Sequence, residues 1–391
     1  MEPRKVYLDN SATSRVDKEV LDAMLPYFTG SFGNPNSFHG WGLCAREAIE
    51  NARRQVADLI GANQKDIIFT GGGSEADNLA IKGTAWARKK PGGHIITSPI
   101  EHHAVLDTVK WLSKSYGIEY TIVPVDQYGR VNPADVEAAI RPDTFLVSIM
   151  FANNEIGTVE PIREIGEICK AHKILFHTDA VQAAGHISIN VDELNIDMMT
   201  MAAHKMRGPK GVGALYVRKG LRLAPLIHGG GQEFGLRSGT ENTPGIVGFG
   251  KAAELAAKRL ENGEPANEAR LRDKLLNGLE ERIPEILVTG SREHRLPYHA
   301  SVCIRHIEGE GILLLMDAAG IAVSSGSACT SSSLEPSYVL LATGLNHETA
   351  HGSVRLTLSP ETTDEDIDYV LQEFPKIAAR LREISPFYHE D

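Results

Sequence analysis

The chain has 391 residues, enough for two domains of ordinary size. Its 40 Lys and Arg residues against 51 Asp and Glu residues give a formal net charge of −11, which disfavours a general nucleic-acid-binding protein. The N-terminus lacks the apolar core of a signal peptide, and no uncharged run is long enough to cross a bilayer. We therefore expect a cytoplasmic protein with no membrane partner and no direct contact with nucleic acid.

The first 245 residues alternate between helical and extended patterns. Nearly all of the expected strands are apolar, which favours an α/β fold with a mostly parallel sheet covered on both faces. The expected helices are residues 18–28, 45–59, 74–89, 103–115 and 162–171, and the expected strands are residues 67–70, 94–97, 120–123, 145–151, 174–177 and 196–201.

Beyond residue 245 the order of elements changes. A long helix over residues 247–282 is interrupted near Gly263, and strands at 300–304, 322–324 and 354–358 then mix with helices at 311–319 and 364–383. This order is typical of an α+β unit. We expect a large domain over residues 15–259, and a smaller domain made of residues 1–14 and 260–391.

The first chemical signal is Thr-Gly-Gly-Gly-Ser at residues 70–74, between an expected strand and an expected helix. Glycines permit a tight turn, and the start of a helix offers free N–H groups to an anion. The spacing also fits a dinucleotide fingerprint, but that reading requires an acid at the end of the next strand, and residues 94–99 contain none. We favour a single phosphate.

The second signal is Asp179, which ends an apolar strand. A carboxylate in that position needs a partner. The partner is either the protonated nitrogen of a pyridine ring or a structural group such as a salt bridge or a helix cap.

The third signal is Lys205, which follows the apolar run 196–201 and precedes Gly208. A strand end of this kind is where α/β proteins place their chemistry, and loss of hydration there favours the neutral, nucleophilic amine. A phosphate site, an acidic strand end and a desolvated lysine together are what pyridoxal 5′-phosphate (PLP) requires.

The cysteines are sparse. Cys44, Cys169, Cys303 and Cys329 form no CxxC pair, so neither a disulfide framework nor a zinc or other metal site is expected. The first three lie in helix or strand patterns and are interpreted as packing residues. Cys329 lies in Ser-Ser-Gly-Ser-Ala-Cys-Thr-Ser-Ser-Ser, residues 324–333, a run too small and polar for a core, which indicates a reactive thiol.

With these motifs the chain resembles the cysteine desulfurases of the NifS/IscS group, which have the aspartate-aminotransferase-like fold of PLP-dependent transferases. The resemblance extends over nearly the whole chain. The segments that carry it are residues 7–13, 32–35, 101–102, 153–157, 179–182, 204–205, 208–211, 228–231, 237–240 and 324–330.

The resemblance implies a role for each matching residue. Lys205 would hold PLP and move the Cα proton, His102 would stack on the ring and act as an acid or base, and Cys329 would receive sulfur. The other residues implied to bind the cofactor are Gly73, Ser74 and His204 at the phosphate, with Thr240 of a neighbouring subunit, and Asp179, Gln182 and Asn154 at the ring. Asn34 and Arg355 would hold the substrate carboxylate.

The implied activity is removal of sulfur from L-cysteine, giving L-alanine and a persulfide on Cys329. The resemblance also implies a homodimer and delivery of sulfur to an iron–sulfur scaffold or a tRNA-thiolation protein. Two positions depart from the family pattern. Ala202 stands where a hydroxyl usually meets the phosphate, and residues 359–361 (Ser-Pro-Glu) replace a basic residue.

Three alternatives remain open from the sequence. The first is another PLP-dependent lyase or aminotransferase, for instance one acting on selenocysteine. The second is a dinucleotide-dependent oxidoreductase, and the third is a non-catalytic binding protein with the same fold.

Overall fold

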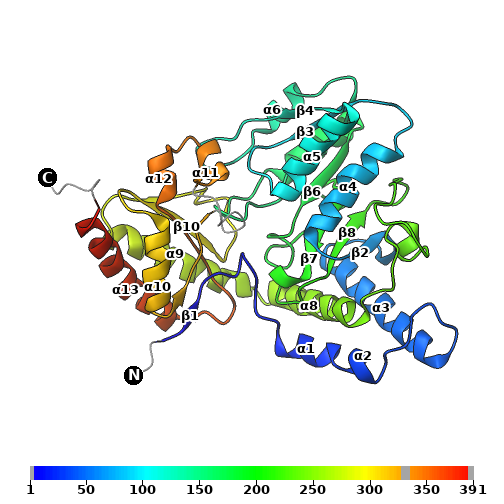
Figure 1. Cartoon of the computed structure of the whole chain (residues 1–391), viewed down its shortest axis with the longest axis horizontal. Coiled ribbons are helices and arrows are strands. Elements are labelled where there is room, and N and C mark those ends of the chain that lie inside the picture. The colour runs from blue at the N-terminus through cyan, green and yellow to red at the C-terminus, as the bar shows by residue number, and fades with distance from the viewer. Residues whose placement is uncertain (1–3, 327–334, 386–391) are drawn as a thin grey trace.

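The computed structural model describes residues 4–326 and 335–385 (Figure 1). The strands are β1 Val6–Tyr7, β2 Ile67–Thr70, β3 His94–Thr97, β4 Glu119–Ile122, β5 Thr144–Ser148, β6 Leu175–Asp179, β7 Met198–Ala202, β8 Gly213–Val217, β9 Ile286–Val288, β10 His299–Ile304, β11 Ile321–Ala322 and β12 Ser353–Thr357. The α-helices are α1 Lys18–Met24, α2 Pro26–Thr29, α3 Gly40–Leu59, α4 Gly73–Ala87, α5 His103–Tyr116, α6 Pro133–Ala138, α7 Ile162–His172, α8 Thr243–Glu261, α9 Glu264–Arg282, α10 Gly309–Ala318, α11 Tyr338–Ala342, α12 His347–His351 and α13 Asp364–Glu383. Three short 3₁₀ helices are η1 Gln64–Asp66, η2 Ala203–Lys205 and η3 Glu233–Gly235.

A seven-stranded sheet forms the centre of the larger part of the molecule. Its strand order is β2-β8-β7-β6-β5-β3-β4. Strand β8 runs antiparallel to both of its neighbours, and the remaining pairs are parallel. The α/β fold with a mostly parallel sheet that the sequence predicts is therefore confirmed.

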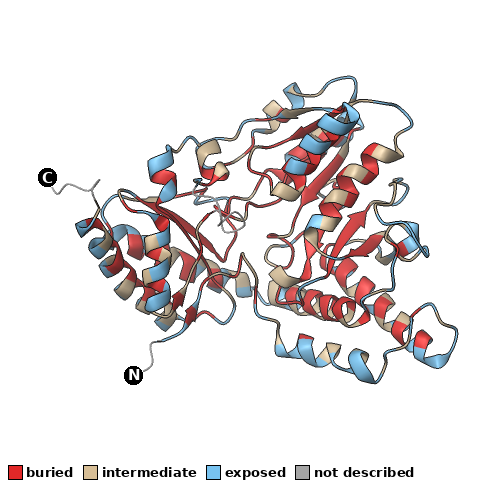
Figure 2. Cartoon of the chain, viewed as in Figure 1, coloured by how far each residue is buried: buried red, intermediate tan, exposed pale blue. Residues whose placement is uncertain are grey.

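Helices cover both faces of this sheet, and most of the strands between them are buried (Figure 2). Consecutive strand residues alternate between two apolar cores: Ile68 and Met198 join α4 and α5 on one face, whereas Phe69 and Met199 join α3 and α8 on the other. This double burial explains the nearly continuous apolar runs in the sequence.

A second body of structure contains the three-stranded antiparallel sheet β12-β10-β9, and helices α9, α10 and α13 pack together beside it (Figure 1). The N-terminal strand β1 pairs in parallel with β11, so Val6 lies opposite Ile321. Helices α8 and α9 are separated at Gly263, whose φ of 72° is left-handed and ends the helical run.

Three local expectations are wrong. The helix expected over residues 18–28 is two helices, because Pro26 has no N–H to continue the hydrogen bonding of α1. The strand expected over residues 145–151 ends at Ser148. Cys44 is exposed and not a packing residue, whereas Cys169 and Cys303 are buried as expected. Among the helices of the described residues, none has the length and apolar character needed to cross a membrane.

Candidate active site

The carboxyl edge of the seven-stranded sheet gathers the residues that the sequence singles out. Strand pairing aligns Thr70, at the end of β2, with Gly213 of β8, and Gly213 in turn with Ala202, at the end of β7. Asp179 at the end of β6 lies opposite Thr200. The segments that leave these strands therefore begin at one edge, as expected for a site in an open α/β sheet.

A cavity of about 300 Å³ opens at this edge, at the small end of the range for ligand pockets. Nine of the predicted site residues line it: Gly73, Ser74, His102, Asn154, Asp179, Gln182, His204, Lys205 and Arg355. A second cavity of about 490 Å³ shares Gly73, Ser74 and His204 with the first and extends along the glycines at residues 71–73.

Lys205 ends the short helix η2 directly after β7, and its side chain reaches the cavity. The ammonium Nζ donates to the carbonyl oxygen of Ala12 at 2.8 Å and to that of Ser11. Both of these acceptors are neutral backbone carbonyls of the N-terminal segment. An amine held at the cavity in this way is placed to react with a ligand there.

Asp179 is buried at the end of β6. Its Oδ1 accepts the backbone N–H of Val181 at 2.9 Å. Burial raises the pKa of Asp179, while His102, the Val181 N–H and Lys205 act in the opposite direction. A buried acid that accepts a backbone N–H and has the Lys205 ammonium as a neighbour suits a carboxylate that pairs with a protonated ring nitrogen.

His102 caps helix α5, and its Nδ1 accepts the N–H of Ala104 at 3.1 Å. Because Nδ1 is an acceptor, the neutral ring carries its proton on Nε2. Burial lowers the pKa of His102, so the neutral ring dominates at pH 7. Burial and the nearby Lys205 lower the pKa of His204 to about 4, and its Nδ1 lies 3.2 Å from the Thr13 hydroxyl.

The start of α4 has the shape of a phosphate site. A Cβ at Gly73 would lie 2.9 Å from Cγ2 of Val181, so the close packing of the helix start against residue 181 requires glycine. The exposed Ser74 follows in the first turn, where free N–H groups attract an anion.

The cavity wall also carries buried polar atoms whose hydrogen-bonding capacity is not used by the protein residues that the structure describes. Asn154 Oδ1, Asp77 Oδ1 and Arg355 Nε are buried and have no hydrogen-bond partner among the residues that the structure describes. Unpaired buried polar atoms are costly, so a polar ligand that reaches them is stabilised. The expected PLP, with its ring nitrogen, ring oxygen and phosphate, fits this donor and acceptor set.

Gln182 and Arg355 are held by protein contacts. Gln182 donates from Nε2 to the Ser11 carbonyl at 3.1 Å and accepts from the Tyr298 hydroxyl at 2.6 Å, which leaves one amide hydrogen for a ligand. Arg355 donates to the carbonyl of Asn154 at 3.0 Å and to the carboxylate of Asp9 at 3.1 Å. Only 3% of the Arg355 side chain is exposed.

Two predicted site residues do not reach this cavity. Asn34 and Thr240 are exposed, and neither lines it. They lie in two loops that approach each other, because Asn36 donates to the carboxylate of Glu241 at 3.2 Å. Cys329 lies outside the described residues.

Several cavity residues carry no prediction from the sequence. Ser11, Ala12, Asp77 and Met150 line the cavity beside the predicted set. Asp77 is four residues after Gly73 in α4, and that helical spacing is the signal that could have placed it on the same face.

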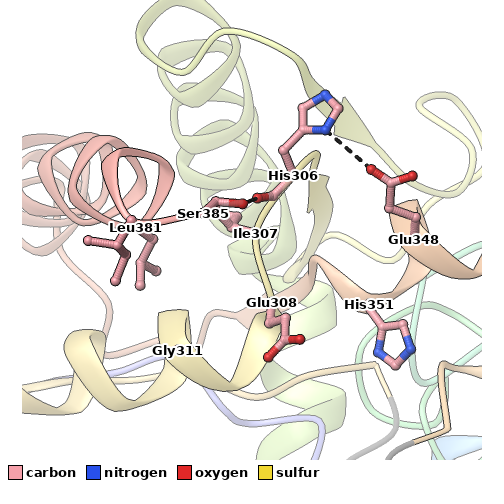
Figure 3. Close-up of a pocket in the computed structure, with 9 residues that line it drawn as sticks. His306, Ile307, Glu308, Gly311, Glu348, His351, Leu381 and Ser385 are labelled. Atoms are coloured by element: carbon pink, nitrogen blue, oxygen red, sulfur yellow. Dashed lines mark hydrogen bonds and ion pairs between the residues drawn. The ribbon is translucent and has the colours of Figure 1, made fainter. Parts of the chain in front are cut away.

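A cavity of about 610 Å³ lies elsewhere, against α10, α12 and α13 (Figure 3). In this cavity, His306 Nδ1 lies 3.2 Å from Glu348 Oε1. None of the predicted site residues lines it. Its size alone therefore does not make it the active site.

Comparison with known proteins agrees with the geometry. The sequence model of the family described as "Aminotransferase class-V" matches residues 6–370. "Cysteine desulfurase IscS" of Methanosarcina thermophila is 54% identical over 385 residues, covering 98% of this chain and 95% of that protein. The protein of the same name from Clostridium botulinum strain Hall is 53% identical over 391 residues, covering 99% and 98%.

Solved structures show the same likeness. A "NIFS-LIKE PROTEIN" superimposes with a TM-score of 0.90 at 41% identity, covering 97% of this chain and all of that one. A structure titled "SspA in complex with cysteine" superimposes with a TM-score of 0.81 at 40% identity, covering 92% and 100%. The fold expected from the sequence is thus shared along almost the whole chain.

Proposed function

The chain belongs to the class-V aminotransferase family, and on that basis we propose that it is a PLP-dependent cysteine desulfurase. It takes sulfur from L-cysteine, releases L-alanine and carries the sulfur as a persulfide on Cys329. The observation that supports this most directly is the meeting of Lys205, Asp179 and Arg355 at one cavity. Similar proteins are named cysteine desulfurases, and one similar structure holds cysteine.

Each cavity residue has a proposed role that follows from its position. Gly73, Ser74 and His204 would hold the phosphate, Asp179 would pair with the ring nitrogen, and Gln182 and Asn154 would contact the ring. PLP would supply an acceptor for electrons from the Cα of the substrate. Lys205 would hold the cofactor and move the Cα proton, and His102 would exchange a proton through Nε2.

Arg355 selects the substrate carboxylate. Its guanidinium is buried, lines the cavity and has its Nε without a partner among the described residues. A planar guanidinium binds a carboxylate through two parallel hydrogen bonds, which fixes the orientation of the amino acid.

The sulfur step requires the Cys329 thiolate. It attacks the substrate sulfur, an S–S bond forms as the Cβ–S bond breaks, and the electron pair left on Cβ takes up a proton to give alanine. The described residues on each side of this segment attach beside the cavity wall. Ser324 exchanges two backbone hydrogen bonds with Arg355, and the Ser337 hydroxyl donates to Glu155, next to Asn154.

We propose that two copies of the chain assemble. Phe32, Phe38 and Trp41 are 65%, 90% and 63% exposed around the loop that carries Asn34, an unusually apolar surface for a monomer. Asn34 and Thr240 lie near this surface and outside the cavity of their own chain, so the cavity they serve is that of a second copy. Light scattering of the purified protein tests the dimer, and a monomer would contradict it.

Three further proposals concern organisation and partners. The domain division at residues 15–259, with 1–14 and 260–391 forming the smaller domain, is supported by the separate sheets and by the β1–β11 pairing. We also propose a cytoplasmic location, which cell fractionation tests. The sulfur acceptor is an iron–sulfur scaffold or a tRNA-thiolation protein, tested by transfer of labelled sulfur from the loaded enzyme.

The function is tested by adding L-cysteine and a reductant to the PLP-loaded protein. We expect alanine and sulfide in equal amounts, and neither product above background from Cys329→Ser. Alanine formation that survives Cys329→Ser unchanged would contradict the proposal. Selenocysteine and alanine as alternative substrates separate this activity from other PLP chemistry.

A further inference from the structure

A second buried carboxyl group lies in the cavity that the proposed chemistry does not use. Asp77, in the second turn of α4, is 1% exposed and lines the same cavity as Asp179. Its Oδ1 has no hydrogen-bond partner among the described residues and lies 3.6 Å from Nε2 of His177.

A chain of buried hydrogen bonds lies beside this carboxyl. The hydroxyl of Ser148 is 2.9 Å from Nδ1 of His177, and Nε2 of His177 is 3.1 Å from the hydroxyl of Thr200. The Thr200 hydroxyl also acts on the Asp77 carboxyl and lowers its pKa, against the larger effect of burial. If Ser148 donates to Nδ1, the imidazole proton lies on Nε2 and is donated to Thr200, which leaves the hydrogen of the Thr200 hydroxyl for another acceptor.

Two carboxyl groups so deeply buried do not both ionise easily. Asp179 accepts a backbone N–H and has His102 and Lys205 as neighbours, whereas the groups that act on Asp77 are Asp179, Glu101 and the Thr200 hydroxyl. The other titratable groups of the cavity wall are His204, Lys205 and Arg355, the last paired with Asp9. The negative charge therefore belongs on Asp179.

His177 is not a cationic partner for the Asp77 carboxyl. Burial lowers the pKa of His177 to about 3, so its ring is neutral at pH 7. Burial and the negative charge of Asp179 raise the pKa of Asp77 well above its ordinary value. The contact at 3.6 Å is thus between a neutral imidazole and a neutral acid.

We propose that Asp77 is a positioning residue, an uncharged carboxylic acid in the same cavity as Asp179 that keeps the single negative charge on Asp179 and excludes water from it. Asp179 then keeps a high affinity for the proton of the ring nitrogen. The inference rests on the proposed function only through the use of PLP. Its tests need no cysteine turnover, so a failed desulfurase assay leaves them valid.

The test compares Asp77→Ala with Asp77→Asn in PLP binding to the apoprotein. We expect Asp77→Ala to weaken PLP binding about tenfold or more, because the buried carboxyl beside Asp179 is lost and water enters its place. The near-isosteric, uncharged Asp77→Asn should restore binding to within about threefold of the wild type. Asp179→Asn removes the negative charge itself, so this variant should bind PLP more weakly than Asp77→Asn does.

A second readout uses the apoprotein alone. An acid whose folded-state pKa is raised keeps its proton while the unfolded chain releases it, so wild-type stability falls as pH rises from 5 towards the folded pKa. The unfolding midpoint of Asp77→Asn, relative to that of the wild type, should therefore increase as pH rises. The control Asp22→Asn, at an exposed position, should show no such increase. Either of two results for Asp77→Asn would overturn the proposal, even if Asp77→Ala failed to fold. One is tenfold weaker PLP binding, and the other is an unfolding midpoint that does not increase relative to the wild type as pH rises.

Discussion

The guanidinium Nη2 of Arg355 lies 3.1 Å from Oδ1 of Asp9, across 346 positions of the sequence. The bond joins the N-terminal segment to β12 at the cavity wall. In the absence of substrate, Asp9 is the carboxylate that Arg355 contacts. A substrate carboxylate that binds Arg355, as proposed above, would therefore compete with an anion that the chain itself supplies.

Asp9→Asn should have two opposite effects. Loss of the negative charge leaves a buried guanidinium less well paired, which should lower the stability of the apoprotein by about 1–3 kcal/mol. The same loss removes the competitor, so the KM for cysteine should fall by roughly 3- to 10-fold. Thermal unfolding and initial-rate kinetics measure the two effects. Asp366→Asn, at a more exposed ion pair with Arg4, is the control, and a raised KM in Asp9→Asn would contradict this account.

Lys205→Ala should reduce turnover about 10³-fold or more, because the amine that holds PLP and moves the Cα proton is removed. Borohydride treatment of the PLP-loaded wild type should fix the cofactor on the peptide that contains Lys205, and mass spectrometry locates it. Lys219→Ala, at an exposed position, is the control and should behave as the wild type. Label on a different lysine would disprove the assignment.

Ala202→Ser should strengthen PLP binding. Ala202 ends β7, is 1% exposed and lines the cavity beside Gly73. One additional neutral hydrogen bond to the phosphate contributes about 0.5–1.5 kcal/mol, or roughly 2- to 12-fold in affinity. Titration of the apoprotein with PLP measures the change. Weaker binding would show that the new hydroxyl cannot reach the phosphate and remains unsatisfied.

Glu101 should make the apoprotein less stable at high pH. It is fully buried beside His102, and burial raises its pKa from 4.5 to about 8. Between these values the unfolded chain has lost the proton and the folded protein has kept it, so stability falls as pH rises, by at most about 1.4 kcal/mol per pH unit. Above pH 8 this contribution becomes constant.

Glu101→Gln should remove that slope. Its unfolding free energy relative to the wild type should rise steadily from pH 5 to pH 8, measured by urea denaturation at several pH values. Exposed Glu47→Gln supplies the control, for which no such trend is expected. A difference that is the same at pH 5 and pH 8 would show that Glu101 ionises normally in the folded protein.

Much of the central sheet was predictable because its strands are buried on both faces. Strands such as Ile67–Thr70 read as unbroken apolar runs, and the polar residues just after them marked the carboxyl edge. Strand β8, Gly213–Val217, was not predicted, because it follows a glycine-rich loop and runs antiparallel to its neighbours. No local pattern distinguishes it from the end of that loop.

Nine of the predicted site residues line one cavity, but the sequence did not show the contacts that hold them there. Lys205 and Asp179 stand out at strand ends, yet nothing near Lys205 in sequence shows that the carbonyls of Ser11 and Ala12 hold its amine. The Asp9–Arg355 contact could not be predicted from the sequence either, because only tertiary packing brings together two residues that are 346 positions apart. The sequence also did not show that Asn34 and Thr240 lie outside the cavity of their own chain.

Lys205 and Cys329 are proposed to act together on cysteine. The mass of the Cys329 peptide, measured after the PLP-loaded enzyme reacts with L-cysteine without reductant, tests this proposal. We expect one sulfur atom to be added to that peptide in the wild type and none in Lys205→Ala. An unmodified Cys329 peptide in a wild-type enzyme that is producing alanine would contradict it.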